Sequence, residues 1–189
     1  MERRYLELHN IETRSDENGE NLYLEGFFVR YDDIYNVWDG VTESIKKGAF
    51  ENSIHGDIRA LYNHNTDIVL GRTSAGTFEV EDREQGLWGR IKLNKRDTEA
   101  VNVYERVARG DVSGCSIGFE IKSEERTVSE DGHVHYTITE IEPLYECTIT
   151  PFPAYEATHI EARHNNEEII KKRALEEWKL QMKTRLKGE

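Results

Sequence analysis

The sequence has 189 residues, of which 33% are charged and 37% hydrophobic, and its net charge is −12 at pH 7. This length suffices for one domain with a real core. The negative charge argues against naked nucleic acid or an anionic membrane as main partner, because phosphate binding needs clustered Lys and Arg. No run approaches the length of a membrane span, and no apolar stretch follows Met1 as in a secretory signal. We therefore expect Cys115 and Cys147 to be reduced core thiols in an intracellular protein.

The first half of the chain alternates strand-like runs with turn signals. Residues 32–40 are predicted as an irregular loop, and residues 42–54 as one or two short helical turns broken at Gly48. A charged turn at 82–86 predicts a hairpin between its two flanking runs. The predicted strands are 3–9, 21–31, 58–62, 67–73, 78–81 and 87–93.

The second half contains the best helix signal. A cap at Asp97 or Thr98, an apolar stripe and a stop at Gly110 predict a helix over 98–109. A second hairpin has its tip at 129–132, and the last strand is 144–150. Residues 164–189 are almost all charged, with apolar residues at helical spacing. We expect a domain at 1–163 and a charged helical tail at 164–189 that packs on a partner or lies loosely on the domain. The fold class is mainly β with a few helices (α+β), arranged as a mainly antiparallel barrel or sandwich.

The functional interpretation of the chain starts from residues 113–119. From Cys115 onward the odd positions are apolar and the even positions are small or polar, which predicts a half-buried strand. Ser116 then lies on the face opposite the core, beside glycines that allow another backbone or a substrate to come close. Taken alone, such a serine is more often an ordinary surface residue.

Two further residues could work with Ser116. Glu146 lies on the polar face of the last strand, where an ordinary solvated glutamate is the common alternative. His64 lies at a strand end before a turn, where a histidine usually makes a local hydrogen bond. A serine hydroxyl needs a base to become a nucleophile, and neutral imidazole suits this task near neutral pH. A carboxylate can fix the imidazole tautomer, so the three residues together predict a nucleophilic hydrolase.

Other chemistry has weaker support. His133 and His135 are two apart on a hairpin strand, but no Cys-x-x-Cys or His-x-x-x-His pair occurs, so we expect exposed hairpin surface rather than a metal site. Cys115 as nucleophile is a further option, although its parity directs it inward, where a thiol is inert. We expect no cofactor and no metal.

Five motifs follow one another in the chain, KGAF at 47–50, ALYNHN at 60–65, LGRT at 70–73, GDVSGCSIGF at 110–119 and LYECTITPFPA at 144–154. In this order they resemble the prohead maturation proteases of tailed bacteriophages, from about residue 20 to 160. The family is similar in fold to the herpesvirus assemblins, so the resemblance implies a small antiparallel β-barrel ringed by helices. Ile117 departs from the family pattern, where an aromatic residue is expected.

The resemblance implies a serine endopeptidase with His64 as base and Ser116 as nucleophile. The third member is a second histidine in the herpesvirus relatives, and the matching strand here offers Glu146. Ser113 matches a variable position. The implied substrates are scaffold protein, or a scaffold-like segment of the major capsid protein, and the enzyme itself. The implied place of action is the immature capsid in the host bacterial cytoplasm. Whether the protein forms an oligomer is left open. A catalytically inactive scaffold module and a hydrolase of small esters or amides remain as alternatives.

Overall fold

The computed structural model describes residues 2–6, 11–16 and 21–151. The chain divides into two units, at Ala154 and Tyr155, and all described residues belong to the first unit. The expected boundary at 163 and 164, and the expected tail, lie outside the described residues. The elements are β1 (Glu2–Leu6), β2 (Glu12–Ser15), β3 (Leu22–Arg30), β4 (Tyr35–Trp38), β5 (Val41–Ile45), β6 (Arg59–Tyr62), β7 (Asn65–Arg72), a 3-10 turn (Thr73–Ala75), β8 (Phe78–Arg83), β9 (Gly86–Leu93), α1 (Thr98–Ala108), β10 (Gly114–Val128) and β11 (Val134–Thr150).

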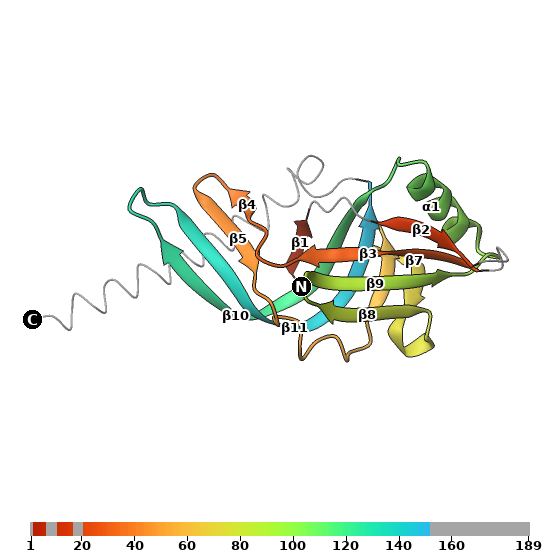
Figure 1. The fold of residues 1–189 in the computed structure, drawn as a ribbon, viewed down its shortest axis with the longest axis horizontal. Coiled ribbons are helices and arrows are strands. Elements are labelled where there is room, and N and C mark those ends of the chain that lie inside the picture. The colour runs from red at the N-terminus through yellow and green to blue at the C-terminus, as the bar shows by residue number, and fades with distance from the viewer. Residues whose placement is uncertain (1, 7–10, 17–20, 152–189) are drawn as a thin grey trace, which may run out of the picture. The chain divides into compact units, whose positions relative to one another are not determined.

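The described strands form two sheets (Figure 1). The larger has the order β1-β10-β11-β5-β4, with β6 also paired to β11 and β7 to β6; the smaller has the order β2-β3-β9-β8. Both β5 and β6 run parallel to β11, one beside its first half and the other beside its second half. The mainly β, α+β class is thus confirmed. Among the described residues, however, the sheets do not close into a barrel and one α-helix is present, so the barrel ringed by helices is not confirmed.

The core contains side chains from both sheets and from α1. The helix begins as predicted, because the Asp97 carboxylate accepts hydrogen bonds from the backbone N–H groups of Glu99 and Ala100. Its apolar stripe buries Ala100, Val103 and Val107. No helix in the part of the chain that the structure describes is long and apolar enough to cross a membrane.

In the region 32–54, one prediction is wrong and another holds only in part. The expected loop contains β4. The range expected to hold helical turns begins instead with β5, and hydrogen-bonded turns follow from Lys46 to Gly56. All five residues of β5 are buried, including three polar ones. The Thr42 hydroxyl is 2.9 Å from a ring nitrogen of both His133 and His135, and these histidines are half-buried rather than exposed. Burial of polar side chains that bond across strands removes the apolar alternation by which strands are predicted.

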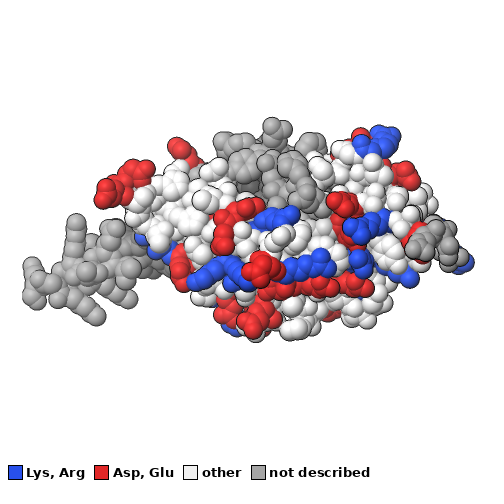
Figure 2. Space-filling view, in the orientation of Figure 1, with Lys and Arg blue, Asp and Glu red and all other residues white. Residues whose placement is uncertain are grey.

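The outer face of the smaller sheet has interleaved charges. Glu25 is 6% exposed, and its carboxylate lies 2.6 Å from guanidinium nitrogens of both Arg14 on β2 and Arg90 on β9. Figure 2 shows acidic and basic side chains in adjacent rows over the face where β8 and β9 lie. A buried carboxylate is tolerated here because two cations bind it.

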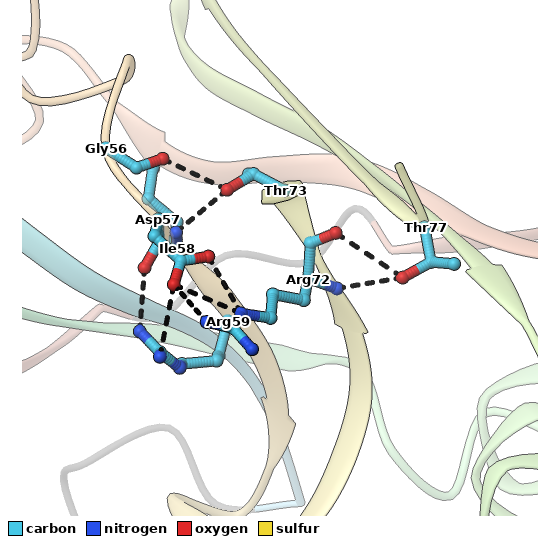
Figure 3. A network of polar contacts seen from close by, with 7 residues as sticks. All are labelled: Gly56, Asp57, Ile58, Arg59, Arg72, Thr73 and Thr77. Atoms are coloured by element: carbon cyan, nitrogen blue, oxygen red, sulfur yellow. Dashed lines mark hydrogen bonds and ion pairs between the residues drawn. The ribbon is translucent and has the colours of Figure 1, made fainter. Parts of the chain in front are cut away.

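A polar network ties the start of β6 to the end of β7 (Figure 3). The Asp57 carboxylate accepts a hydrogen bond of 2.8 Å from Nε of Arg72, and it also contacts the guanidinium of Arg59 at 3.2 Å. The Thr73 hydroxyl accepts from the backbone N–H of Ile58 and donates to the carbonyl of Gly56. These bonds fix the open end of the β6–β7 hairpin, whose other end has a two-residue turn.

Replacement of Asp57 by Asn tests this network. The hydrogen bond from Arg72, then one from Ser74, lowers the pKa of Asp57 below its ordinary value of 3.8. A lowered folded-state pKa means that the carboxylate stabilises the fold above pH 3.8, and that this effect is lost as the pH falls through the folded-state pKa. At pH 7 we expect Asp57→Asn to lower the Tm by no more than about 2–4 °C, the scale of one exposed ion pair. The difference between wild type and variant should shrink in acid, as measured by thermal unfolding monitored by circular dichroism. A difference that is constant with pH would contradict a stabilising role of the Asp57 carboxylate. The control is Asp111→Asn, at an exposed aspartate bonded to Arg109.

Candidate active site

His64 lies in a tight turn between β6 and β7. Tyr62 pairs with Asn65 across the hairpin, which leaves Asn63 and His64 as the two central residues. Their φ angles are 52° and 57°. A two-residue hairpin loop of type I′ requires φ > 0 at both positions, and Asn and His tolerate this region better than most residues. The sequence at the turn therefore suits the backbone that holds the imidazole.

The turn is attached to the end of β11. The backbone N–H of Asn63 donates to the carbonyl of Ile149 at 2.9 Å, and the Thr150 hydroxyl donates to Oδ1 of Asn63 at 3.2 Å. Since β6 runs parallel to β11, with Tyr62 opposite Ile149, the chain that leaves β6 turns beside the last residues of β11. His64 is thereby held close to the polar face of β11.

Strand register places the other two predicted residues on that same face. In the antiparallel pair β10–β11, Ser116 lies opposite Thr148 and Gly118 lies opposite Glu146. Residues that are directly opposite share a face, and residues two apart along a strand share it too. Ser116, Glu146 and Thr148 therefore lie together on one face, while Cys115 and Cys147 lie on the other.

His64 and Glu146 are in direct contact. Nδ1 of His64 is 2.8 Å from Oε1 of Glu146, and the two side chains are only 7% and 5% exposed. The second carboxylate oxygen, Oε2, accepts a hydrogen bond of 3.1 Å from the Thr148 hydroxyl. An ionised carboxylate only accepts hydrogen bonds, so the imidazole tautomer that pairs with it carries its hydrogen on Nδ1 and leaves the basic lone pair on Nε2. This is the tautomer that a general base needs.

Ser116 lies on the predicted face but is not approachable in this arrangement. It is 0% exposed, as is Thr148 opposite it. The strand β10 is an interior strand here, paired with β11 on one side and with β1 on the other, where Tyr5 lies opposite Ser116. The prediction of an accessible serine is therefore wrong, because alternation determines the face of a strand and not what covers it.

The alternative nucleophile and carboxylates lie elsewhere. Cys115 is fully buried in the core, and burial raises the pKa of its thiol, which leaves the thiolate unavailable. Ser113 is exposed and precedes β10. Asp67 and Glu142 are exposed, and Glu142 binds Lys122. Of the three carboxylates considered, Glu146 is thus the one within hydrogen-bond distance of His64.

The family model described as caudovirus prohead serine protease matches residues 9–173. The chain belongs to this family. The resemblance inferred from the five motifs is confirmed, and so is the assignment to the serine peptidases. The prohead protease of Enterobacteria phage HK97 is 27% identical over 158 residues, which cover 82% of this chain and 67% of that protein. Among solved structures, the bacteriophage T4 capsid assembly protease, gp21, aligns with a TM-score of 0.42 and 11% identity, over 79% of this chain and 90% of that one.

Sequence reasoning missed the residues that support this constellation. Thr148 binds Glu146, and Thr150 binds Asn63. The signal was available, because the two threonines follow Glu146 by two and by four residues and so share its face. Threonine is common in strands, which is why it carries little information about function until a partner is known.

Substitution of Asn63 tests the turn. We expect Asn63→Val to lower the free energy of unfolding by about 1–2 kcal/mol, because a β-branched residue is strained at positive φ. Asn63→Gly should be more stable than Asn63→Val, since glycine adopts this region freely and both variants lose the hydrogen bond from Thr150. Chemical denaturation measures both. Equal stability of the two variants would contradict a turn with φ > 0 at position 63.

Proposed function

We propose that this member of the prohead protease family is the endopeptidase that matures the capsid of a tailed bacteriophage, with Ser116 as nucleophile, His64 as general base and Glu146 as the third member. The observation that supports the triad is the buried 2.8 Å contact between His64 and Glu146, beside the strand that presents Ser116 on the same face. The substrates are scaffold protein or a scaffold-like segment of the major capsid protein, and the enzyme also cleaves itself. Cleavage takes place inside the immature capsid in the bacterial cytoplasm.

The mechanism follows from these groups. Nε2 of His64 takes the Ser116 proton as Oγ attacks the scissile carbonyl carbon, and the carbonyl oxygen becomes an oxyanion. The imidazolium then gives this proton to the leaving amine, the C–N bond breaks and an acyl-enzyme forms. Water then attacks the acyl-enzyme with His64 again as base, the bond from the acyl carbon to Ser116 Oγ breaks, and the imidazolium returns the proton to Oγ. Glu146 stabilises the imidazolium and keeps its orientation throughout.

The burial of Ser116 adds a requirement. A substrate carbonyl has to come within about 3–3.5 Å of the nucleophile, and a serine with 0% exposure cannot meet it. Ser116 must therefore become accessible before the first step. Accordingly, an active-site probe reports access and chemistry together.

The substrate class is tested by co-expression with candidate capsid and scaffold proteins, followed by mass spectrometry of the fragments. We expect new termini in a capsid or scaffold protein, which disappear with a Ser116→Ala enzyme. Unchanged partner proteins, together with turnover of small esters, would favour a small-substrate hydrolase. An intact partner and no labelling of Ser116 by a fluorophosphonate would favour an inactive structural module.

Ser116→Ala should abolish proteolysis while the protein remains folded. Removal of one hydroxyl opens no large cavity, so we expect a stability change of less than about 1 kcal/mol. Cleavage of the co-expressed partner and thermal unfolding measure the two effects. Ser113→Ala is the matched control and should stay active. If Ser113→Ala is inactive and Ser116→Ala is active, the nucleophile is assigned wrongly.

Glu146→Gln should slow the reaction by about 10² to 10³, which corresponds to roughly 3–4 kcal/mol of barrier. The amide keeps the shape of the side chain but removes the charge that stabilises the imidazolium. His64→Ala should slow it further. In the Glu146→Gln variant the His64 imidazolium has no anionic partner and loses its proton at lower pH. The rise of the pH–rate profile should therefore move to lower pH. Near-normal turnover with an unmoved profile would exclude Glu146 from the site.

A further inference from the structure

The triad proposed above leaves open what holds the Glu146 carboxylate in place. Glu146 belongs to β11, and its neighbour across the antiparallel pair is Gly118 on β10. Side chains at directly opposite positions normally have Cβ atoms about 4.5–5.5 Å apart and fill the space between them. At position 118 there is no side chain, and Glu146 occupies that space.

The fit between Gly118 and Glu146 leaves no room for a methyl group. A Cβ atom at position 118 would lie 2.7 Å from Cγ of Glu146, 2.8 Å from Oε1 and 3.2 Å from Cδ. Oε1 is the oxygen that contacts Nδ1 of His64. The carboxylate that contacts the imidazole therefore lies against the α-carbon of Gly118. A methyl group at position 118 would collide with this carboxylate.

Backbone conformation does not explain this glycine. The glycines at positive φ are elsewhere in the described residues, for example Gly110 at 82° and Gly132 at 84°, and a Cβ atom at either would meet nothing within 4 Å. Gly118 is the reverse case, because its backbone suits any residue and its surroundings do not. The motif glycine is thus required for space, and the group that needs the space is Glu146.

Thr148 acts on the other carboxylate oxygen. It follows Glu146 by two residues on the same face, is 0% exposed, and donates to Oε2 at 3.1 Å. A hydrogen bond in such a desolvated place is directional and costly to lose. One oxygen thus faces the imidazole over Gly118, and the other is held by a hydroxyl from the same strand.

We propose that Gly118 and Thr148 are positioning residues, which together hold the Glu146 carboxylate in the orientation that places Oε1 against Nδ1 of His64. The inference rests on the proposed triad and extends it to two residues that contact the Glu146 side chain. Gly118 acts by the absence of a side chain, and Thr148 acts by one hydrogen bond.

The test is a double-mutant cycle, read by the rate at which a fluorophosphonate labels the full-length chain. Labelling forms a bond from Ser116 Oγ to phosphorus, expels fluoride and passes the serine proton to His64, so the rate reports the triad, together with access to Ser116, without a known peptide substrate. We expect Gly118→Ala to slow labelling on the order of 10², close to the effect of Glu146→Gln. In the Glu146→Gln background the same change should slow it less than about threefold, because the charge that it displaces is already absent.

A second readout separates positioning from general distortion. Gly118→Ala should move the rise of the pH–rate profile to lower pH, as Glu146→Gln does, because the imidazolium loses its anionic partner in both. The matched control is Gly89→Ala on β9, where a Cβ atom would lie 2.8 Å from ring atoms of Phe28 and Phe78, away from the site. We expect this control to lower the Tm but to leave the profile of the folded enzyme unmoved.

Thr148 is tested by two variants, of which one removes the hydroxyl and the other keeps it. Thr148→Val removes the hydroxyl and should slow labelling by about tenfold, while Thr148→Ser keeps the hydroxyl and should stay within about twofold of wild type. This pair also tests the inference if Gly118→Ala does not fold.

Several outcomes would overturn the inference. They are a near-wild-type rate for Gly118→Ala, an equal loss in both backgrounds of the cycle, and a Thr148→Val enzyme as fast as Thr148→Ser. A Glu146→Gln enzyme with near-normal labelling is different, because it refutes the triad itself. Failure of the proposed function and failure of this inference are thus distinguishable.

Discussion

The candidate site depends on one constraint, the register of three strands. Glu146 faces His64 because β10, β11 and β6 are aligned so that Gly118 and Glu146 are opposite, while Tyr62 ends β6 beside Ile149. Side chains alternate with a period of two, so a slip of one residue in β11 would turn Glu146 into the core and Cys147 toward His64. The hydrogen bond from the backbone N–H of Asn63 to the carbonyl of Ile149 fixes this alignment directly beside His64.

The same constraint explains how a carboxylate can be buried on this face. Burial of an ionised group is costly unless hydrogen bonds and charges compensate it. Glu146 has His64 on one oxygen and Thr148 on the other; the His64 side chain is 7% exposed and Thr148 is 0% exposed. Glu25 on the smaller sheet shows a different solution, in which two arginines bind the acid. A full cation beside Glu146 would compete with the imidazolium that forms during catalysis, whereas a hydroxyl and an imidazole leave that role to His64.

Much of the site could be predicted from the sequence because it depends on local patterns. Alternation places Ser116 and Glu146 on polar faces of their strands, and His64 falls in a segment with turn-forming neighbours. The order of the five motifs adds the family. The helix α1 was predictable for the same reason, since its cap at Asp97 and its apolar stripe are features of consecutive residues.

What could not be predicted depends on contacts between residues far apart in sequence. Strand β5 has polar residues at positions that the fold buries, because Thr42 and Ser44 bond to His135 on β11. Ser116 is 0% exposed, and the strand that carries it is paired with β1, from the beginning of the chain, as well as with β11. Parallel pairing of β5 and β6 with β11 likewise joins segments separated by many residues, and this gives two sheets in the described residues where a barrel was expected. Periodicity thus specifies the face on which a side chain lies. How far that face is buried depends on contacts between segments that are distant in sequence. The access of a substrate to Ser116 depends on this burial.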